Sequence, residues 1–170
     1  MNSTIESALN DQLNFEMYSA NIYLAMSAYF DAMGLPGFAH WMQVQYQEEM
    51  VHAMKFYHFI NERTGRAKFA ALPEPQFEWD SPEDAFATAL AHEKIVSGRI
   101  NDLMAMANDE KDFATANFLQ WFVAEQVEEE ASADAVLQRI KLTEGAAGAL
   151  FMLDAELGQR VFTPPADTEA

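Results

Sequence analysis

The sequence predicts an all-α protein, a four-helix bundle with one long crossover connection and a short fifth C-terminal helix. Four long segments repeat apolar residues at the three- and four-residue spacing of a buried helix face. Short turns join the first segment to the second and the third to the fourth, whereas residues 66–80 form one long connection between the two pairs. No stretch shows the apolar–polar alternation of a half-buried strand.

Local signals delimit the first two helices. Ser3, followed three residues later by Glu6, forms a capping-box pattern that predicts a helix over residues 3–31. A second helix is expected over residues 38–64, with Gly65 at the usual helix-ending position. The two helices should therefore form an antiparallel pair.

The second half of the chain repeats this arrangement. The run Ser81-Pro82-Glu83-Asp84 combines a capping serine with proline and acids in the first turn, and predicts a third helix to about residue 108. A fourth helix is expected over residues 112–142, and the apolar stretch ALFMLDAEL predicts the short fifth. We expect one domain over residues 1–158 and a proline-bearing tail over 159–170.

Composition narrows the class of function. The 170 residues contain no cysteine, which excludes disulfides, thiolate zinc sites and iron–sulfur clusters, so a bound metal would have oxygen and imidazole ligands. The net charge of -17 disfavours nucleic acid and favours cations as partners. Charges interrupt every apolar run before it could span a membrane, and the N-terminus does not resemble a secretory signal. We expect no membrane partner and a cytoplasmic location.

Each predicted core stripe carries a glutamate near its middle. These residues are Glu16, Glu49, Glu93 and Glu129. An unpaired carboxylate costs several kcal/mol to bury, so four of them at similar depth need a common cause. A polyvalent cation would stabilise the ionised cluster, because its charge offsets their mutual repulsion.

A nitrogen ligand is expected beside these acids. Glu49 and His52 are three residues apart, and therefore lie on the same face of a helix, where one ion can bind both. Oxygen-rich ligation with imidazole suits iron, manganese or zinc. The pattern predicts a metal centre inside the bundle without choosing between these ions.

These segments resemble the ferritin family, and in particular prokaryotic non-haem ferritins. The segments NFEMYSANIYLAMS, QYQEEMVHAM and EKDFATANFLQWFVAEQVEEE, with the short terminal helix, have the order and spacing of that family from about Ile5 to Leu157. The resemblance implies an iron-storage protein with ferroxidase activity, which oxidises Fe(II) with O2 or H2O2 and stores ferric mineral in a homo-oligomeric cage of 24 subunits. It implies two irons per subunit and a third, accessory position.

The resemblance also assigns roles to individual residues. It implies a first iron site at Glu16, Glu49 and His52, with Glu49 bridging to a second iron. By the same matching, the remaining residues of the centre are Glu93, Glu129, Gln126 and the adjacent Tyr23. The accessory third position is matched by Glu48, Glu125 and Glu128.

One departure separates the chain from bacterioferritins. They carry a second Glu-x-x-His on the fourth helix, whereas Gln126-Val127-Glu128-Glu129 has no histidine. No haem is therefore expected, although Met50 stands where bacterioferritins place their haem-ligating methionine. The alternatives to a non-haem ferritin are a haem-binding bacterioferritin-type cage, another di-iron carboxylate protein, and a helical module that binds a structural ion without turnover.

Overall fold

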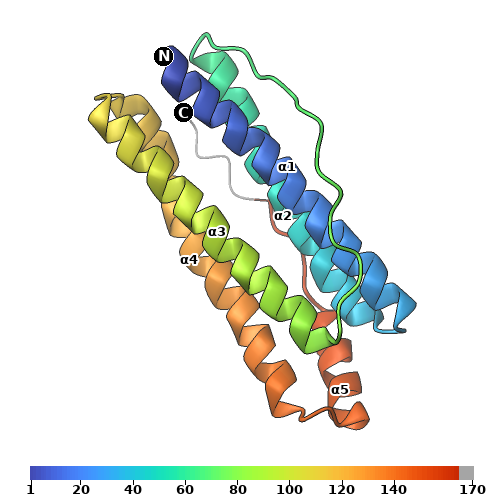
Figure 1. Cartoon of the computed structure of the whole chain (residues 1–170). Coiled ribbons are helices and arrows are strands. Elements are labelled where there is room, and N and C mark those ends of the chain that lie inside the picture. The colour runs from blue at the N-terminus through green and yellow to red at the C-terminus, as the bar shows by residue number, and fades with distance from the viewer. Residues whose placement is uncertain (165–170) are drawn as a thin grey trace.

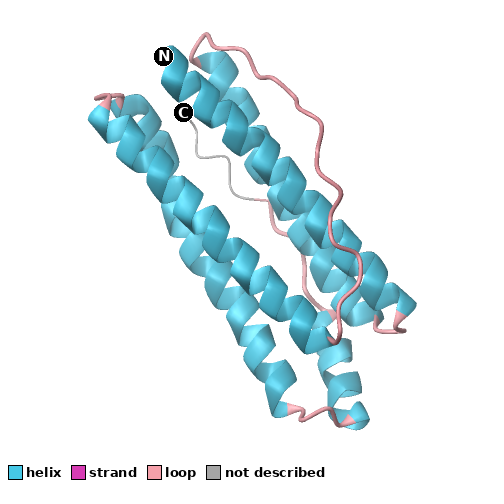
Figure 2. Cartoon of the chain, in the orientation of Figure 1, coloured by secondary structure: helices cyan, strands magenta, loops and turns pink. Residues whose placement is uncertain are grey.

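The computed structural model describes residues 1–164, and contains five helices and no strand within them. α1 packs along α2, α3 packs along α4, and the two pairs form an elongated bundle with α5 at one end (Figures 1 and 2). The helices are α1 (Ser3–Ala32), α2 (Pro36–Glu62), α3 (Pro82–Asp109), α4 (Phe113–Leu142) and α5 (Ala147–Leu157). The predicted four-helix bundle with a crossover and a short fifth helix is confirmed.

The crossover between α2 and α3 runs the length of the bundle beside α1 (Figure 1). Asn10 donates from Nδ2 to the Arg66 carbonyl at 3.1 Å and accepts from the Lys68 amide at 2.6 Å. Asn14 makes the same pair of contacts one turn later, with the Lys68 carbonyl and the Ala70 amide, both at 2.8 Å. These side chains satisfy backbone groups that have no strand or helix partner.

The capping residues at two helix ends differ from the sequence prediction. The N-cap of α1 is Asn2, whose side chain accepts from the Ile5 amide at 2.8 Å, so Ser3 is the first helical residue and not the cap. At the end of α2 the left-handed residue is Thr64, with φ of 59°, and Gly65 follows it and donates to the Ile60 carbonyl at 2.9 Å. Each cap lies one residue before the predicted position, and α2 itself spans residues 36–62 where the sequence predicted 38–64.

A polar layer divides the apolar core of the bundle into two clusters. On α1, Leu9 and Leu13 belong to one cluster and Met26 and Phe30 to the other, with Glu16 between them. The other long helices repeat this division. The single mid-helix glutamate of each stripe therefore faces a common level inside the bundle.

The fifth helix supplies the N-terminal cap of α2. Leu35 precedes α2 and offers no side-chain cap, but Oδ1 of Asp154 accepts from the Gly37 and Phe38 amides at 2.8 and 2.9 Å. A side chain at Gly37 would collide with the Asp154 carbonyl, 1.7 Å from the position of its Cβ.

No helix within residues 1–164 is long and apolar enough to cross a membrane.

Candidate metal centre

The four core glutamates and the predicted imidazole are all buried. Glu16 and Glu93 are fully buried, Glu49 is 1% exposed, Glu129 5% and His52 2%. Each comes from a different helix except Glu49 and His52, which share one face of α2. The structure thus brings together inside the bundle the residues that the sequence placed at mid-helix.

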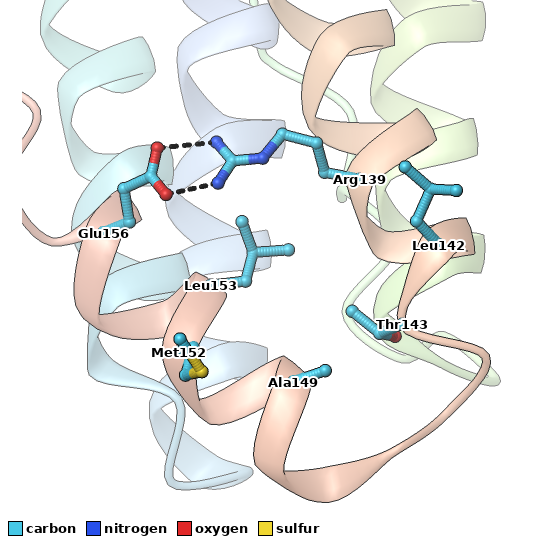
Figure 3. A pocket seen from close by; sticks show the side chains of 7 residues that line it. All are labelled: Arg139, Leu142, Thr143, Ala149, Met152, Leu153 and Glu156. Carbon is cyan, nitrogen blue, oxygen red and sulfur yellow. Dashed lines mark hydrogen bonds and ion pairs between the residues drawn. The ribbon is translucent and has the colours of Figure 1, made fainter.

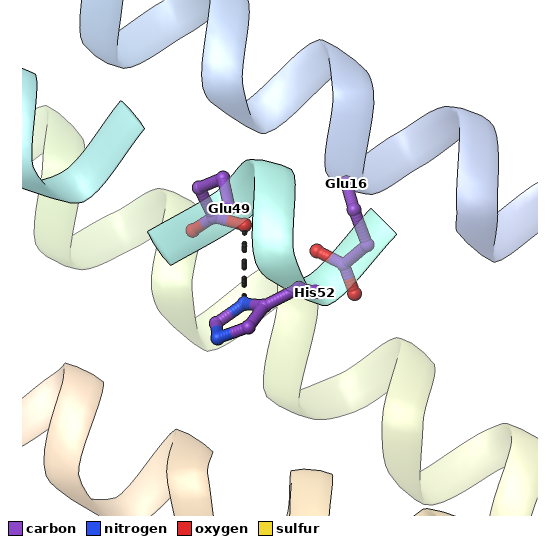
Figure 4. A group of neighbouring side chains, drawn as sticks. All are labelled: Glu16, Glu49 and His52. Carbon is purple, nitrogen blue, oxygen red and sulfur yellow. Dashed lines mark ion pairs between the residues drawn. The ribbon is translucent and has the colours of Figure 1, made fainter. Parts of the chain in front are cut away.

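Glu16, Glu49 and His52 form the first group of potential ligands (Figure 4). One ligand atom from each lies within 4.8 Å of the others, and Nδ1 of His52 is 3.4 Å from Oε2 of Glu49. Oε2 of Glu16 and Oε2 of Glu49 are buried without a hydrogen-bond partner. Such orphaned oxygens are unfavourable in a folded protein unless a cation or proton binds them, so this group fits a metal ion.

The second half of the centre is held by hydrogen bonds. Tyr23 donates its hydroxyl proton to Oε1 of Glu93, and Nε2 of Gln126 donates to Oε2 of the same carboxylate at 3.1 Å. Gln45 donates to Oε2 of Glu129 at 2.8 Å. The predicted neighbours Tyr23 and Gln126 therefore both contact Glu93.

Burial and crowding raise the pKa values of these acids. Burial, followed by the charges of Glu93, Glu16 and Glu129, raises the pKa of Glu49 well above its ordinary range. Burial raises the pKa of Glu93 to about 7 against the hydrogen bonds from Tyr23 and Gln126. Burial and the charge of Glu93 raise the pKa of Glu129 to about 7. Without a cation the centre therefore favours protons.

Three supporting residues were not predicted from the sequence. Nε2 of Gln12 donates to Oε1 of Glu16 at 2.8 Å, and Nε of Arg99 donates to Oε1 of Gln12 at 2.8 Å, which fixes the orientation of the amide. Gln45 has the corresponding role beside Glu129. Gln12 precedes Glu16 by four residues on the same helix, a spacing that offers a usable sequence signal, whereas Gln45 contacts a glutamate of another helix.

The three acids matched to an accessory position have different surroundings. Glu125 is half-buried, and its Oε1 lies 3.9 Å from Nε2 of His52, in a group that also contains Glu129. Glu48 instead accepts a hydrogen bond from Arg160 at 2.7 Å. Glu128 is exposed. The structure therefore brings Glu125 to the centre, pairs Glu48 with Arg160, and leaves Glu128 at the surface.

A groove elsewhere in the molecule has no part in this centre. It has a volume of about 360 Å³ and lies between α5 and the end of α4 (Figure 3). Arg139 and Glu156 form an ion pair across it. None of the predicted metal ligands lines it.

Similarity to known proteins identifies the family to which the chain belongs. A family model described as the ferritin-like domain matches residues 6–143. The chain belongs to the ferritin family. Bacterial non-heme ferritin from Bacteroides fragilis (strain 638R) is 44% identical over 156 residues, which cover 92% of this ferritin and 97% of that protein. The corresponding protein from Staphylococcus aureus (strain MRSA252) is 37% identical over 162 residues, covering 95% and 98%.

Solved ferritin structures have the same fold. The open-pore ferritin of the archaeon Archaeoglobus fulgidus matches with a TM-score of 0.94 at 52% identity, covering 95% of this ferritin and 99% of that chain. A form of that ferritin engineered to be closed gives a TM-score of 0.95 at 53% identity, covering 96% and 99%. The resemblance read from the sequence is confirmed, and iron storage is the function of this ferritin.

Proposed function

We propose that this ferritin is a ferroxidase that binds two Fe(II) ions as substrates in the carboxylate layer. Glu16, Glu49 and His52 would hold one ion, and Glu49, Glu93 and Glu129 the other. The observation that carries the proposal is the pair of buried, unpartnered oxygens on Glu16 and Glu49. They belong to different helices and lie in one group with the imidazole of His52.

Some of these side chains would hold the ions, and others would position the ligands. Glu49 keeps the two ions together, so that two electrons leave in one event. O2 takes these two electrons and two protons to give H2O2, and H2O2 takes two further electrons and two protons to give water. Gln126 is neutral and bonds to Glu93, so it would leave the second ion more weakly held and let the oxidised product depart.

The product must then be stored. Ferric ions hydrolyse to an oxyhydroxide, and a closed assembly of this chain would keep that solid in solution. We propose a homo-oligomeric cage of 24 subunits in the cytoplasm, with an accessory third iron position at Glu48, Glu125 and Glu128. The net charge of -17 on each chain favours cation uptake.

Substitution at Glu49 tests the proposal. Because Glu49 is placed between the two ions and His52 beside one of them, Glu49→Ala should abolish rapid Fe(II) oxidation, whereas His52→Ala should leave slow oxidation. Stopped-flow absorbance after anaerobic Fe(II) protein is mixed with O2 measures both. Glu62→Ala, at an exposed acid of the same helix, is the control and should keep the wild-type rate.

Two outcomes would contradict this assignment. A wild-type rate in an assembled Glu49→Ala protein would exclude the paired site as the place of oxidation. A wild-type protein that binds iron without oxidising more than a few equivalents would indicate a structural ion in place of turnover. Repeating the reaction with H2O2 as sole oxidant identifies which oxidant the centre uses.

A further inference from the structure

The segment that follows α5 turns back along the bundle (Figure 1), and its Arg160 packs against Trp41 of α2. The guanidinium of Arg160 lies 4.4 Å from the centre of the Trp41 ring. Its Nη1 donates to the Trp41 carbonyl at 3.4 Å, and Nε2 of His40 lies 2.7 Å from the Arg160 carbonyl oxygen. Backbone and side chain are therefore both anchored to α2, and the cation has a fixed position.

The partner of this cation is Glu48, the neighbour of the bridging glutamate. Nη2 of Arg160 donates to Oε2 of Glu48 at 2.7 Å, and the two side chains are only 22% and 20% exposed. Ion pairs with this degree of burial are screened less than surface pairs. Glu48 thus has a permanent positive partner although it lies next to the metal centre.

Glu48 also lies on the face of α2 that carries His52. It precedes His52 by four residues, a spacing at which side chains of one helix are neighbours, and Nε2 of His52 is 3.9 Å from Oε1 of Glu125. Glu125 and Glu129 form a group of potential ligands with His52. Glu48 therefore lies at the edge of this group. Without the contact to Arg160 it would be available to bind an additional divalent cation.

We propose that Arg160 is a built-in competitor for this position, which lowers the affinity of the edge of the centre for a third divalent cation by holding Glu48. The choice of Fe(II) as the natural cation rests on the proposed function. A metal ion must break a charge-assisted hydrogen bond and remain near a fixed guanidinium, which together typically correspond to about ten- to hundredfold in a binding constant. The chain would thereby direct the first ions to the paired site.

A purely structural role makes different predictions from competition. If Arg160 only fastened the C-terminal segment to α2, its loss would change stability and leave metal binding alone. Competition requires that the effect depend on positive charge and on Glu48. Arg160→Lys keeps the charge, Arg160→Gln removes it, and Glu48→Gln removes the acid.

Titration of the metal-free assembled protein with Zn(II), which undergoes no redox change, separates the two roles. Calorimetry should show that Arg160→Gln binds a third Zn(II) about tenfold or more tightly than wild type, with the first two sites unchanged. Arg160→Lys should stay near wild type. Adding Glu48→Gln to Arg160→Gln should abolish the gain. The control Arg139→Gln, at an arginine paired with exposed Glu156, should have no effect.

The inference would be overturned if Arg160→Gln bound the third ion no more tightly than wild type, or if its gain persisted without Glu48. If Arg160→Gln fails to assemble, Arg160→Met can replace it in the same titration, because the unbranched methionine side chain can still pack on the Trp41 ring. Absence of the two tight sites from wild type would count against the proposed function. The third-site comparison would still decide the role of Arg160.

Discussion

At the scale of single residues, some oxygens of the core glutamates accept hydrogen bonds from neighbouring side chains, whereas others have no hydrogen-bond partner. Glu16 accepts from Gln12 through Oε1 and leaves Oε2 free, whereas both oxygens of Glu93 accept hydrogen bonds. Neighbouring groups of this kind orient ligands before a metal arrives. The centre is therefore preorganised at Glu16 and Glu93, while Glu49 keeps an unpartnered oxygen.

The raised pKa values of Glu93 and Glu129 predict how the metal-free protein responds to pH. Both pKa values are about 7 in the folded chain against an ordinary 4.5. A pKa raised by folding contributes stability that is present below the unfolded value and is lost as the pH rises through the folded value. The melting temperature of the metal-free protein should therefore fall between about pH 5 and pH 8.

Calorimetry of chelator-treated protein at several pH values measures this dependence. Glu93→Gln removes one titrating group, so it should flatten the profile and raise the melting temperature at the alkaline end. Saturation with Zn(II) should also reverse the loss, because the ion takes the place of the protons. A melting temperature that rose with pH in the metal-free wild type would contradict the assigned environment.

The residues of the centre differ in how far the sequence could predict them. Glu16, Glu49, Glu93 and Glu129 were predictable because a carboxylate on an apolar stripe breaks the helical pattern. The pairing of Arg160 with Glu48 was not, since the two residues are 112 positions apart and neither interrupts a periodicity. Local patterns specify which face a residue occupies, whereas its partners depend on how distant segments pack.

At the scale of helices, the same distinction explains the N-terminus of α2. The sequence predicted a start near residue 38, and the helix begins at Pro36 without a local capping side chain. Its cap is Asp154 of α5, a residue that packs there only after the chain has folded. Long-range capping of this kind gives no local capping signal before Pro36.

The close contact between α2 and α5 predicts a large effect of a single methyl group. Gly37→Ala would place Cβ on the Asp154 carbonyl and should separate α5 from the bundle, with a cost of about 1–3 kcal/mol from overpacking and a further ~1 kcal/mol from the lost cap. Gly98→Ala on α3 is the control, since its Cβ would meet no atom within 4 Å. It should be neutral or stabilise by up to about 1 kcal/mol.

Chemical unfolding of both variants under identical conditions measures the difference. Protection of the α5 amides from hydrogen exchange should decrease in Gly37→Ala, because α5 would no longer be held by Asp154. The same amides should keep their protection in Gly98→Ala. Equal stability of the two variants would mean that α5 does not pack on α2 as described.

At the scale of the whole molecule, the single chain exposes more apolar surface at one end than a monomer needs. Leu142, Phe151 and Met152 are 82, 71 and 75% exposed, and they lie on or beside the groove between α4 and α5. Clustered exposed apolar side chains mark surfaces that other subunits cover. The net charge of -17 per chain opposes association, so contacts of this kind must outweigh the repulsion.

The mass of the native assembly tests this account together with the proposed cage. Light scattering after size exclusion should give about 460 kDa, the mass of twenty-four 19.1 kDa chains. Phe151→Glu places a charge in the exposed apolar cluster and should reduce the assembly to small species that keep their helical circular dichroism. The control Gln138→Glu, at an exposed polar position of α4, should leave the mass unchanged. A wild-type mass near 19 kDa would exclude storage in a cage, because one chain has no enclosed volume in which to hold a mineral.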